Sequence, residues 1–315
     1  HFSDFVISKI PFSELVDTDV DTDFSPGVDD WQFVNRGSYI AKGGHCAGQS
    51  LTAMWYYYEQ YLGAGERRLY GRYDNNDYGY GTIDFQEDDS WGYRWASVAQ
   101  RKQWNKGIAV YRFWGLTGDS LTWHSFAYAM KLTGEPQYVS IGRYVEKDGK
   151  QVRRGHALIA YRIEGNRLWV ADPNYPGKTD RYISFQNGAF QPYASGANAI
   201  DIAVNGVRAY SEIHYLGKTA LIDWDKIGVE YDKLLEGKSG EGYFPTYGFW
   251  YLAEYNPVTG EATWLPLPEM LELDEADTTK TGEAKRGKLV VGINMTPNAG
   301  MVTRYNGTRP AEDRE

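Results

Sequence analysis

The sequence predicts an α+β protein in which helices come first, an antiparallel sheet follows, and a small β-rich module ends the chain. Three observations predict this order. Apolar residues with helical spacing follow residue 46, short strand-like runs joined by turn signals fill residues 137–171, and a second set of β-rich runs lies beyond residue 216. We therefore divide the 315 residues into an acidic leader (1–30), a main domain (31–216) and a C-terminal module (217–315).

Three segments are predicted to be helical. Residues 46–62 carry apolar side chains three and four positions apart, which places them on one helical face, and two glycines follow. Residues 119–132 begin at an Asp-Ser pair suited to an N-cap, and Gly134 stops the helix. A third helix is expected over 223–235. The stretch 73–92 is rich in Asp, Asn and Gly, so we expect a long polar loop there.

The strands of the main domain are expected to pair as neighbours. A Glu-Gly-Asn turn at 164–166 predicts a hairpin between the second and third of them. In the C-terminal module, an Asn-Pro-Val-Thr-Gly turn at 256–260 joins two further β-rich arms. The predicted strands are 137–144, 156–163, 167–171, 247–255, 262–265 and 289–295.

Charge and composition exclude several classes of partner. The chain has 42 acidic and 33 basic residues and a net charge of −9, without the Lys/Arg block that phosphate binding needs, so we expect no nucleic-acid partner. It has no run of about 18 apolar residues, and we expect no membrane insertion. The first residue is His1 rather than Met, with no apolar leader after it, which is typical of a trimmed product. The composition favours a secreted or cell-surface bacterial protein.

The single cysteine, Cys46, defines the candidate site. It stands in Gly43-Gly44-His45-Cys46-Ala47-Gly48, where a flexible glycine pair meets the start of the first helix. Backbone N–H groups and the positive end of the helix dipole stabilise an anion there, which favours the reactive thiolate. The alternative is that Cys46 is a small buried hydrophobe, as most free cysteines are.

A second segment supplies partners for this thiol. His156 follows a glycine at the start of a predicted strand, and Asp172 stands sixteen residues later in an Asp-Pro sequence. If the two strands form a hairpin about the turn at 164–166, both residues lie at the same end of it. Asp172 can then accept a hydrogen bond from one imidazole nitrogen and leave the other for the thiol. Asn174 is a second candidate for the orienting role.

These motifs together resemble the papain-like cysteine peptidase superfamily, and within it the bacteriocin-processing (double-glycine) peptidases and their secreted relatives. The resemblance covers roughly residues 31–216 and includes Ser50, four positions after the cysteine. It implies a papain-like fold with Cys46 as nucleophile, His156 as general base and Asp172 as orienting residue. It also implies a peptide or protein substrate, thioester chemistry and no required cofactor.

One position departs from that family. Papain-like enzymes carry a glutamine six residues before the cysteine that helps to bind the oxyanion, and Ile40 stands there in this chain. An oxyanion donor contributes about 3 kcal/mol to transition-state stabilisation, so the chemistry needs one. The nearest upstream amide belongs to Asn35, which we expect to act with the Cys46 backbone N–H.

Two other histidines and a glutamine lie near these motifs in the sequence. His45 would point away from the thiol at a helix start, so we expect it to line the cleft or the surface. His124 lies in the second predicted helix beside a tryptophan, and we expect it to pack in the core. Gln49 lies one turn into the first helix and is expected to face elsewhere.

The acidic leader carries the one candidate metal site. Asp17, Asp19, Asp21 and Asp23 stand at every second position, and spaced carboxylates can bind calcium through oxygen ligands. The match to an EF-hand loop is poor, because Phe24 stands where that loop turns on a glycine. Structural calcium and a solvated acidic leader are the two interpretations.

Two other functions compete with the peptidase. A transglutaminase-like acyl transferase also uses Cys, His and Asp, although its histidine commonly follows the cysteine more closely. A non-catalytic glycan- or peptide-binding module would use exposed aromatic side chains, which otherwise fill a core. The candidates for such stacking are Trp91, Tyr93, Trp95, Trp104, Trp114 and Trp123.

Overall fold

The structure is a computed structural model that describes residues 16–38, 40–73, 91–102, 118–196, 208–240, 243, 247–255, 262–264, 271–272 and 288–295. The chain divides into two compact units, residues 1–235 and 236–315. The first is a mixed α+β unit, and the second contains paired strands. Within the described ranges, no helix is long and apolar enough to cross a membrane.

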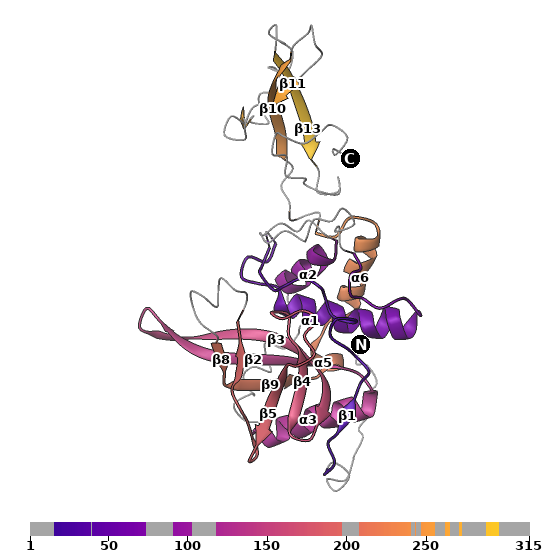
Figure 1. The fold of residues 1–315 in the computed structure, drawn as a ribbon, viewed down its shortest axis with the longest axis vertical. Coiled ribbons are helices and arrows are strands. Elements are labelled where there is room, and N and C mark those ends of the chain that lie inside the picture. The colour runs from indigo at the N-terminus through magenta and orange to yellow at the C-terminus, as the bar shows by residue number, and fades with distance from the viewer. Residues whose placement is uncertain are drawn as a thin grey trace. The chain divides into compact units, whose positions relative to one another are not determined.

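The first unit is built on an antiparallel sheet of order β6-β5-β4-β3-β2-β9, with β1 paired to β3 (Figure 1). A separate two-stranded sheet joins β7 to β8. The strands are β1 (Val20–Asp21), β2 (Gln137–Lys147), β3 (Lys150–Glu164), β4 (Arg167–Ala171), β5 (Tyr182–Gln186), β6 (Ala189–Phe190), β7 (Tyr193–Ser195), β8 (Arg208–Tyr210) and β9 (Glu212–Leu216).

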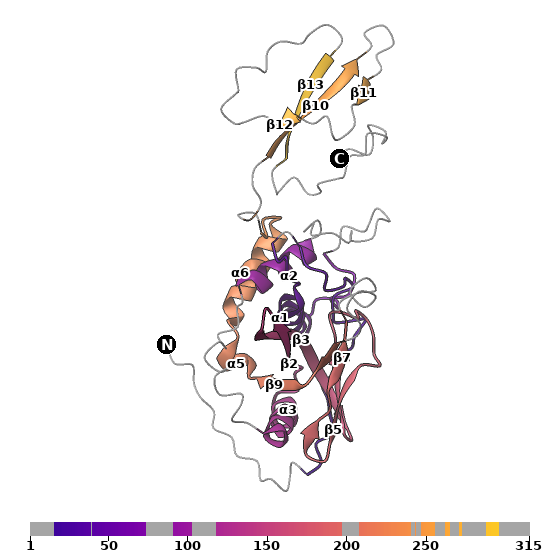
Figure 2. The ribbon, with the colours of Figure 1, turned by 90° about the vertical axis from the view of Figure 1, so that its left-hand side faces the viewer.

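Helices cover both faces of this sheet (Figures 1 and 2). One side is covered by α1 (Cys46–Trp55), α2 (Trp91–Lys102) and α6 (Trp224–Leu235), and the other by α3 (Asp119–Thr133). The first helix continues as a π-helical segment, η2 (Tyr56–Gly63), and a short helix α5 (Lys218–Leu221) precedes α6. Residues of β3 alternate between the two cores: Ala157 and Ile159 pack with α1, whereas Leu158 and Ala160 pack with α3.

The expected helices over 119–132 and 223–235 are confirmed as α3 and α6. Gly134 caps α3 at φ +68°, and its N–H donates to the Met130 carbonyl. The expected helix over 46–62 is confirmed as α1 followed directly by η2, whose geometry is π-helical.

Helix α2 was not expected. It packs so closely on α1 that a Cβ on Gly48 would lie 1.8 Å from the Ala96 carbonyl oxygen. Gly48 therefore permits the close approach of the two backbones.

The long hairpin of β2 and β3 extends beyond the expected strands 137–144 and 156–163. Asp148 and Gly149 connect the strands with φ of 53° and 69°. Positive φ at both positions is what a two-residue type I′ turn requires, and Asp-Gly supplies it at low cost. The predicted turn at 164–166 is confirmed, since Glu164 pairs with Arg167.

The expected domain boundaries differ from the division that the structure shows. The segment expected as a leader is part of the first unit, because β1 pairs with β3 and Phe24 is buried. Residues 218–235 also belong to it rather than to the C-terminal module. Tyr231 of α6 packs 5.0 Å from Trp55 and 5.1 Å from Trp95, measured between ring centroids.

The second unit contains an antiparallel sheet, as expected for a β-rich module. β10 pairs with each of the three other strands. They are β10 (Tyr247–Tyr255), β11 (Ala262–Trp264), β12 (Leu271–Glu272) and β13 (Lys288–Met295).

Candidate active site

Cys46 is the first residue of α1, and its side chain remains partly exposed. The chain reaches it through Gly44, whose φ of +110° suits glycine. The thiol lies beside the His156 side chain and the Ala157 backbone N–H, near enough for both to lower its pKa. The sulfur therefore lies where β3 meets the N-terminus of α1.

His156 is held between this thiol and Asp172. Its Nε2 lies 2.7 Å from Asp172 Oδ1, and both side chains are buried. Because Asp172 occupies Nε2, the Nδ1 atom is the nitrogen left to face the sulfur. The β3–β4 hairpin brings the two residues together, as its turn at 164–166 predicted. The structure thus places Cys46, His156 and Asp172 next to one another, as expected.

The Asp172 carboxylate accepts four hydrogen bonds. Oδ1 accepts from His156 and from the Asn174 backbone N–H at 2.9 Å. Oδ2 accepts from the Tyr193 hydroxyl at 2.7 Å and the Ser195 hydroxyl at 2.8 Å. Tyr193 and Ser195 belong to β7, and sequence reasoning missed both because no motif surrounds them. Together these donors fix the orientation of the carboxylate that holds the imidazole.

The electrostatics of the three groups favour a charged pair. Burial alone would raise the pKa of Cys46, but the His156 charge and the hydrogen bonds to the sulfur hold it below the usual value. Burial would lower the pKa of His156, but the charges of Asp172 and Cys46 raise it to about 10. The pKa of Asp172 is lowered despite its burial, because of His156. Both shifts are in the direction that favours a thiolate beside an imidazolium.

The N-terminus of α1 is capped by a side chain from α2. Gln100 Oε1 accepts the N–H groups of Ala47 at 2.8 Å and Gly48 at 3.1 Å, and the Gln49 N–H donates to the His45 carbonyl. Among the hydrogen bonds of the described residues, none uses the Cys46 backbone N–H. That N–H is therefore a first-turn donor available to a bound group beside the sulfur.

Asn35 lies beside the loop that leads to the thiol. Its Oδ1 accepts the His45 backbone N–H at 2.6 Å, and its Nδ2 donates to Asn174 Oδ1 at 2.9 Å. Asn174 in turn donates to the Ser195 hydroxyl. A chain of hydrogen bonds thus joins Asp172 to the backbone just before Cys46. One N–H of the Asn35 side-chain amide donates to Asn174 in this chain of hydrogen bonds. The expected role of Asn35 as an oxyanion donor depends on the second N–H of the same amide.

Two expectations for histidines are wrong, and one for a glutamine is confirmed. His45 is fully buried and stacks on Phe33 with ring planes 1° apart, so it lines neither cleft nor surface. Burial lowers the pKa of His45 to about 3, which keeps it neutral. His124 lies outside the core, and its Nδ1 binds the Ser120 carbonyl one turn earlier in α3. Gln49 faces away from the thiol and donates to the Phe33 carbonyl.

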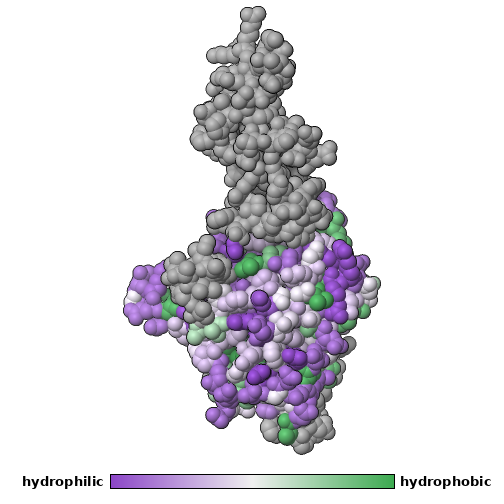
Figure 3. All heavy atoms as spheres, in the orientation of Figure 1, coloured by the Kyte–Doolittle hydropathy of each residue, from purple (hydrophilic) through white to green (hydrophobic). Residues whose placement is uncertain are grey.

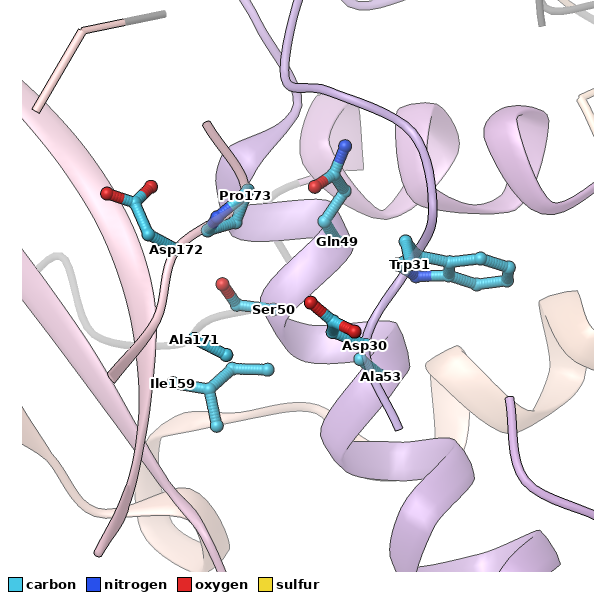
Figure 4. A pocket seen from close by; sticks show the side chains of 9 residues that line it. All are labelled: Asp30, Trp31, Gln49, Ser50, Ala53, Ile159, Ala171, Asp172 and Pro173. Carbon is cyan, nitrogen blue, oxygen red and sulfur yellow. The ribbon is translucent and has the colours of Figure 1, made fainter. Parts of the chain in front are cut away.

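A small cavity lies behind the site, between α1 and the β3–β4 layer (Figure 4). Ser50 is part of its wall, and in the described residues the Ser50 hydroxyl finds no hydrogen-bond partner. Asp30 lies across the cavity and accepts the N–H groups of Gly27 and Gly177; burial raises its pKa to about 6. The lining residues are Asp30, Trp31, Gln49, Ser50, Ala53, Ile159, Ala171, Asp172 and Pro173.

The acidic leader places its four aspartates on the surface. Asp17 and Asp21 each accept a backbone N–H two residues on, and Asp19 accepts the Gly165 N–H at 2.7 Å. Asp23 is exposed as well. Alternate residues of an extended chain stand about 7 Å apart, which spreads the carboxylates. In the parts of the chain that the structure describes, no three His, Cys, Asp or Glu residues are grouped as metal ligands.

The aromatic residues considered for glycan stacking are mainly core residues. Tyr93, Trp95 and Trp123 are buried, and Trp91 is half-buried. The other two candidates, at 104 and 114, lie outside the described residues. Packing around α1 and α3 thus accounts for the three buried aromatic side chains.

Comparisons with protein-family models, with curated proteins and with solved structures gave no match. The functional argument therefore depends on the geometry of the site.

Proposed function

We propose that this chain is a cysteine peptidase with a papain-like arrangement, in which Cys46, His156 and Asp172 form the catalytic triad. The observation that carries the proposal is the contact of the sole thiol with His156, whose other nitrogen lies 2.7 Å from Asp172. A nucleophile, a base and an orienting carboxylate in this order are the components of acyl transfer. The placement of the thiol at a helix start adds to this support.

The reaction proceeds in two steps. The Cys46 thiolate attacks the peptide carbonyl carbon, and the carbonyl oxygen becomes an oxyanion that accepts the Cys46 backbone N–H, with Asn35 as the second donor. His156 gives its proton to the leaving amine as the C–N bond breaks, which leaves a thioester. Water then attacks the thioester, His156 accepts the water proton, and a carboxylic acid and free thiolate are released.

Hydrolysis of a degenerate peptide library, followed by mass spectrometry, tests the proposal. Wild-type protein is expected to produce new peptide termini, and the Cys46→Ala variant none. His124→Ala is the matched control, because His124 lies in α3 and outside the core. A Cys46→Ala variant that cleaves as fast as the wild type would refute the proposal.

The same assay separates hydrolysis from acyl transfer to an amine. Both reactions begin with the same thioester, and they differ in the group that resolves it. If an added primary amine appears in the products in preference to water, the chain is a transglutaminase-like transferase. The burial of Tyr93, Trp95 and Trp123 gives no support to a glycan-binding module.

A further inference from the structure

The β2–β3 hairpin continues beyond the rest of the sheet as a two-stranded ribbon. β9 pairs with β2 only over 138–142, and β4 pairs with β3 only from Ile159 onward. The ribbon therefore includes residues 143–155, and it protrudes in Figure 1. Its surface there is strongly hydrophilic in Figure 3.

One face of this ribbon carries a row of cations. The pairing runs without a bulge from Gln137↔Ala160 to Lys147↔Lys150, so side chains alternate strictly between the faces. Arg143 stands opposite Arg154 and Lys147 opposite Lys150, with two valines between the pairs. Like charges directly opposite each other destabilise a sheet. We call these four side chains the cationic face.

The acidic partner near this hairpin lies on the opposite face. Arg153 Nε binds Glu212 Oε2 at 2.7 Å, and both lie over Gly142. Among the described residues, no ion pair joins a carboxylate to any of the four cations of the cationic face. Among these residues no carboxylate therefore offsets the repulsion between Arg143 and Arg154 or between Lys147 and Lys150.

The cationic face is continuous with the candidate active site. His156 is two residues beyond Arg154 on the same strand, and strand alternation places both on one face. Tyr210 of β8 confirms this placement, because its ring lies 6.0 Å from the His156 ring and 5.7 Å from the Arg143 guanidinium carbon. The four cations therefore extend outward from the histidine of the triad.

We propose that the cationic face binds an acidic, extended segment of the peptide substrate beside the bond that is cleaved. This inference rests on the proposed peptidase function and names the class of substrate. At about 3.3 Å per residue, Arg154 stands about 7 Å and Lys150 about 20 Å along the strand from His156. Acidic residues within about six positions of the cleaved bond can therefore reach these cations, and alternate acidic residues fit them best.

Binding is measured on the full chain with Cys46→Ala, so that catalysis does not interfere. The probe is a fluorescein-labelled peptide of alternating Glu and Ser, and the same peptide with Gln in place of Glu is its neutral control. Fluorescence anisotropy is expected to give at least about fivefold tighter binding for the acidic peptide. Added salt is expected to reduce this preference, because Lys147, Lys150 and Arg154 are exposed.

Two variants with the same change of net charge locate the binding face. Lys150→Gln removes a positive charge from the cationic face, and Gln151→Glu adds a negative charge on the other face of the same ribbon. We expect Lys150→Gln to weaken binding of the acidic peptide about threefold or more, and Gln151→Glu to weaken it much less. Equal effects of the two variants would overturn the proposal, because they would indicate attraction by overall charge.

Two further outcomes distinguish this inference from the peptidase proposal. If the acidic peptide binds no better than the neutral one while the wild type still cleaves the library, the inference is wrong and the peptidase proposal stands. If the acidic peptide binds at the cationic face and Cys46→Ala does not reduce cleavage, the peptidase proposal fails alone. Tighter binding of a sulfated oligosaccharide or an oligonucleotide than of the acidic peptide would also overturn the inference.

Discussion

At the scale of single residues, the site depends on opposing effects of burial and charge. Burial favours the neutral forms of Cys46 and His156, and their mutual attraction favours the charged forms. The attraction prevails because Asp172, itself held by four hydrogen bonds, stabilises the imidazolium. The reactivity of Cys46 therefore depends on the charge of its neighbour.

The first prediction concerns the pH dependence of alkylation. With the pKa of Cys46 lowered, the wild-type rate with iodoacetamide should stay high below the usual thiol pKa and fall only as Cys46 gains its proton. His156→Gln removes the charge that offsets burial most strongly, so the pKa of Cys46 rises. We expect the rate near neutral pH to fall at least about tenfold. Superimposable pH profiles for the two proteins would contradict this explanation.

The second prediction concerns the upper pH limit of hydrolysis. His156 must be protonated to give its proton to the leaving amine, and its pKa is raised to about 10. Activity should therefore persist above neutral pH and decline as the pH approaches that value. A decline of kcat/KM centred near pH 6.5, the ordinary histidine pKa, would show that the ion pair does not form.

The third prediction concerns Tyr193. Tyr193→Phe removes a donor to Asp172 and leaves Arg181 Nε without the hydroxyl that it binds at 3.0 Å. We expect a loss of about 1–2 kcal/mol in the free energy of unfolding and a fall in kcat of up to about tenfold. Tyr58→Phe, at an exposed tyrosine of η2, is the control. Equal kcat values for the two variants would exclude a positioning role for Tyr193.

The proximity of Cys46, His156 and Asp172 could be predicted from the sequence, and the residues that support them could not. Cys46, His156 and Asp172 stand in motifs whose spacing relates directly to a helix start and a hairpin. Tyr193, Ser195 and Gln100 act from strands or helices whose position depends on the tertiary fold, so their roles have no local signature. His45 was misjudged because its place in an aromatic cluster follows from packing.

At the scale of elements, the close contact of α1 with α2 fixes the start of α1, where Cys46 lies. Gly48 lets the backbones approach, and Gln100 caps the first turn from the neighbouring helix. Apolar spacing predicted α1, an N-cap pair and a glycine stop predicted α3, and α6 was expected as well. The sequence analysis did not predict α2, because it assigned residues 73–92 to a polar loop that overlaps the start of this helix. It also missed the Asp148-Gly149 turn, which lengthens β2 and β3.

The fourth prediction tests the contact of the two helices. In Gly48→Ala the new Cβ would lie 1.8 Å from the Ala96 carbonyl, so the helices must separate. We expect a loss of about 2 kcal/mol or more in the free energy of unfolding, measured with denaturant. Gly43→Ala is the matched control, because a Cβ there meets no atom within 4 Å. Equal stability of the two variants would show that the helices do not pack this closely.

At the scale of the whole molecule, the compact unit that holds Cys46, His156 and Asp172 is larger than the sequence suggested. Residues 16–30 and 218–235 belong to the unit that contains the triad, because Phe24 and Tyr231 are buried in its core. Composition alone placed the boundaries at residues 30 and 216, where the character of the sequence changes. A change in composition along the chain does not reveal aromatic packing between residues that are far apart in the sequence.

The fifth prediction tests this boundary. A chain that ends at Leu235 keeps Tyr231 on Trp55 and Trp95, and it is expected to unfold in one cooperative transition. A chain that ends at Leu216 loses this packing and should be less stable by at least about 3 kcal/mol. Chemical denaturation followed by tryptophan fluorescence measures the difference. Equal midpoints for the two chains would place the boundary at residue 216.

The central claim is that His156 activates Cys46 as a nucleophile. The most direct test is covalent labelling by a peptidyl epoxide near neutral pH, measured as the intact mass of the full chain. The account predicts a single adduct on Cys46 in the wild type and in His124→Ala, and no adduct in His156→Ala or Cys46→Ala. Labelling of His156→Ala at the wild-type rate would contradict the account.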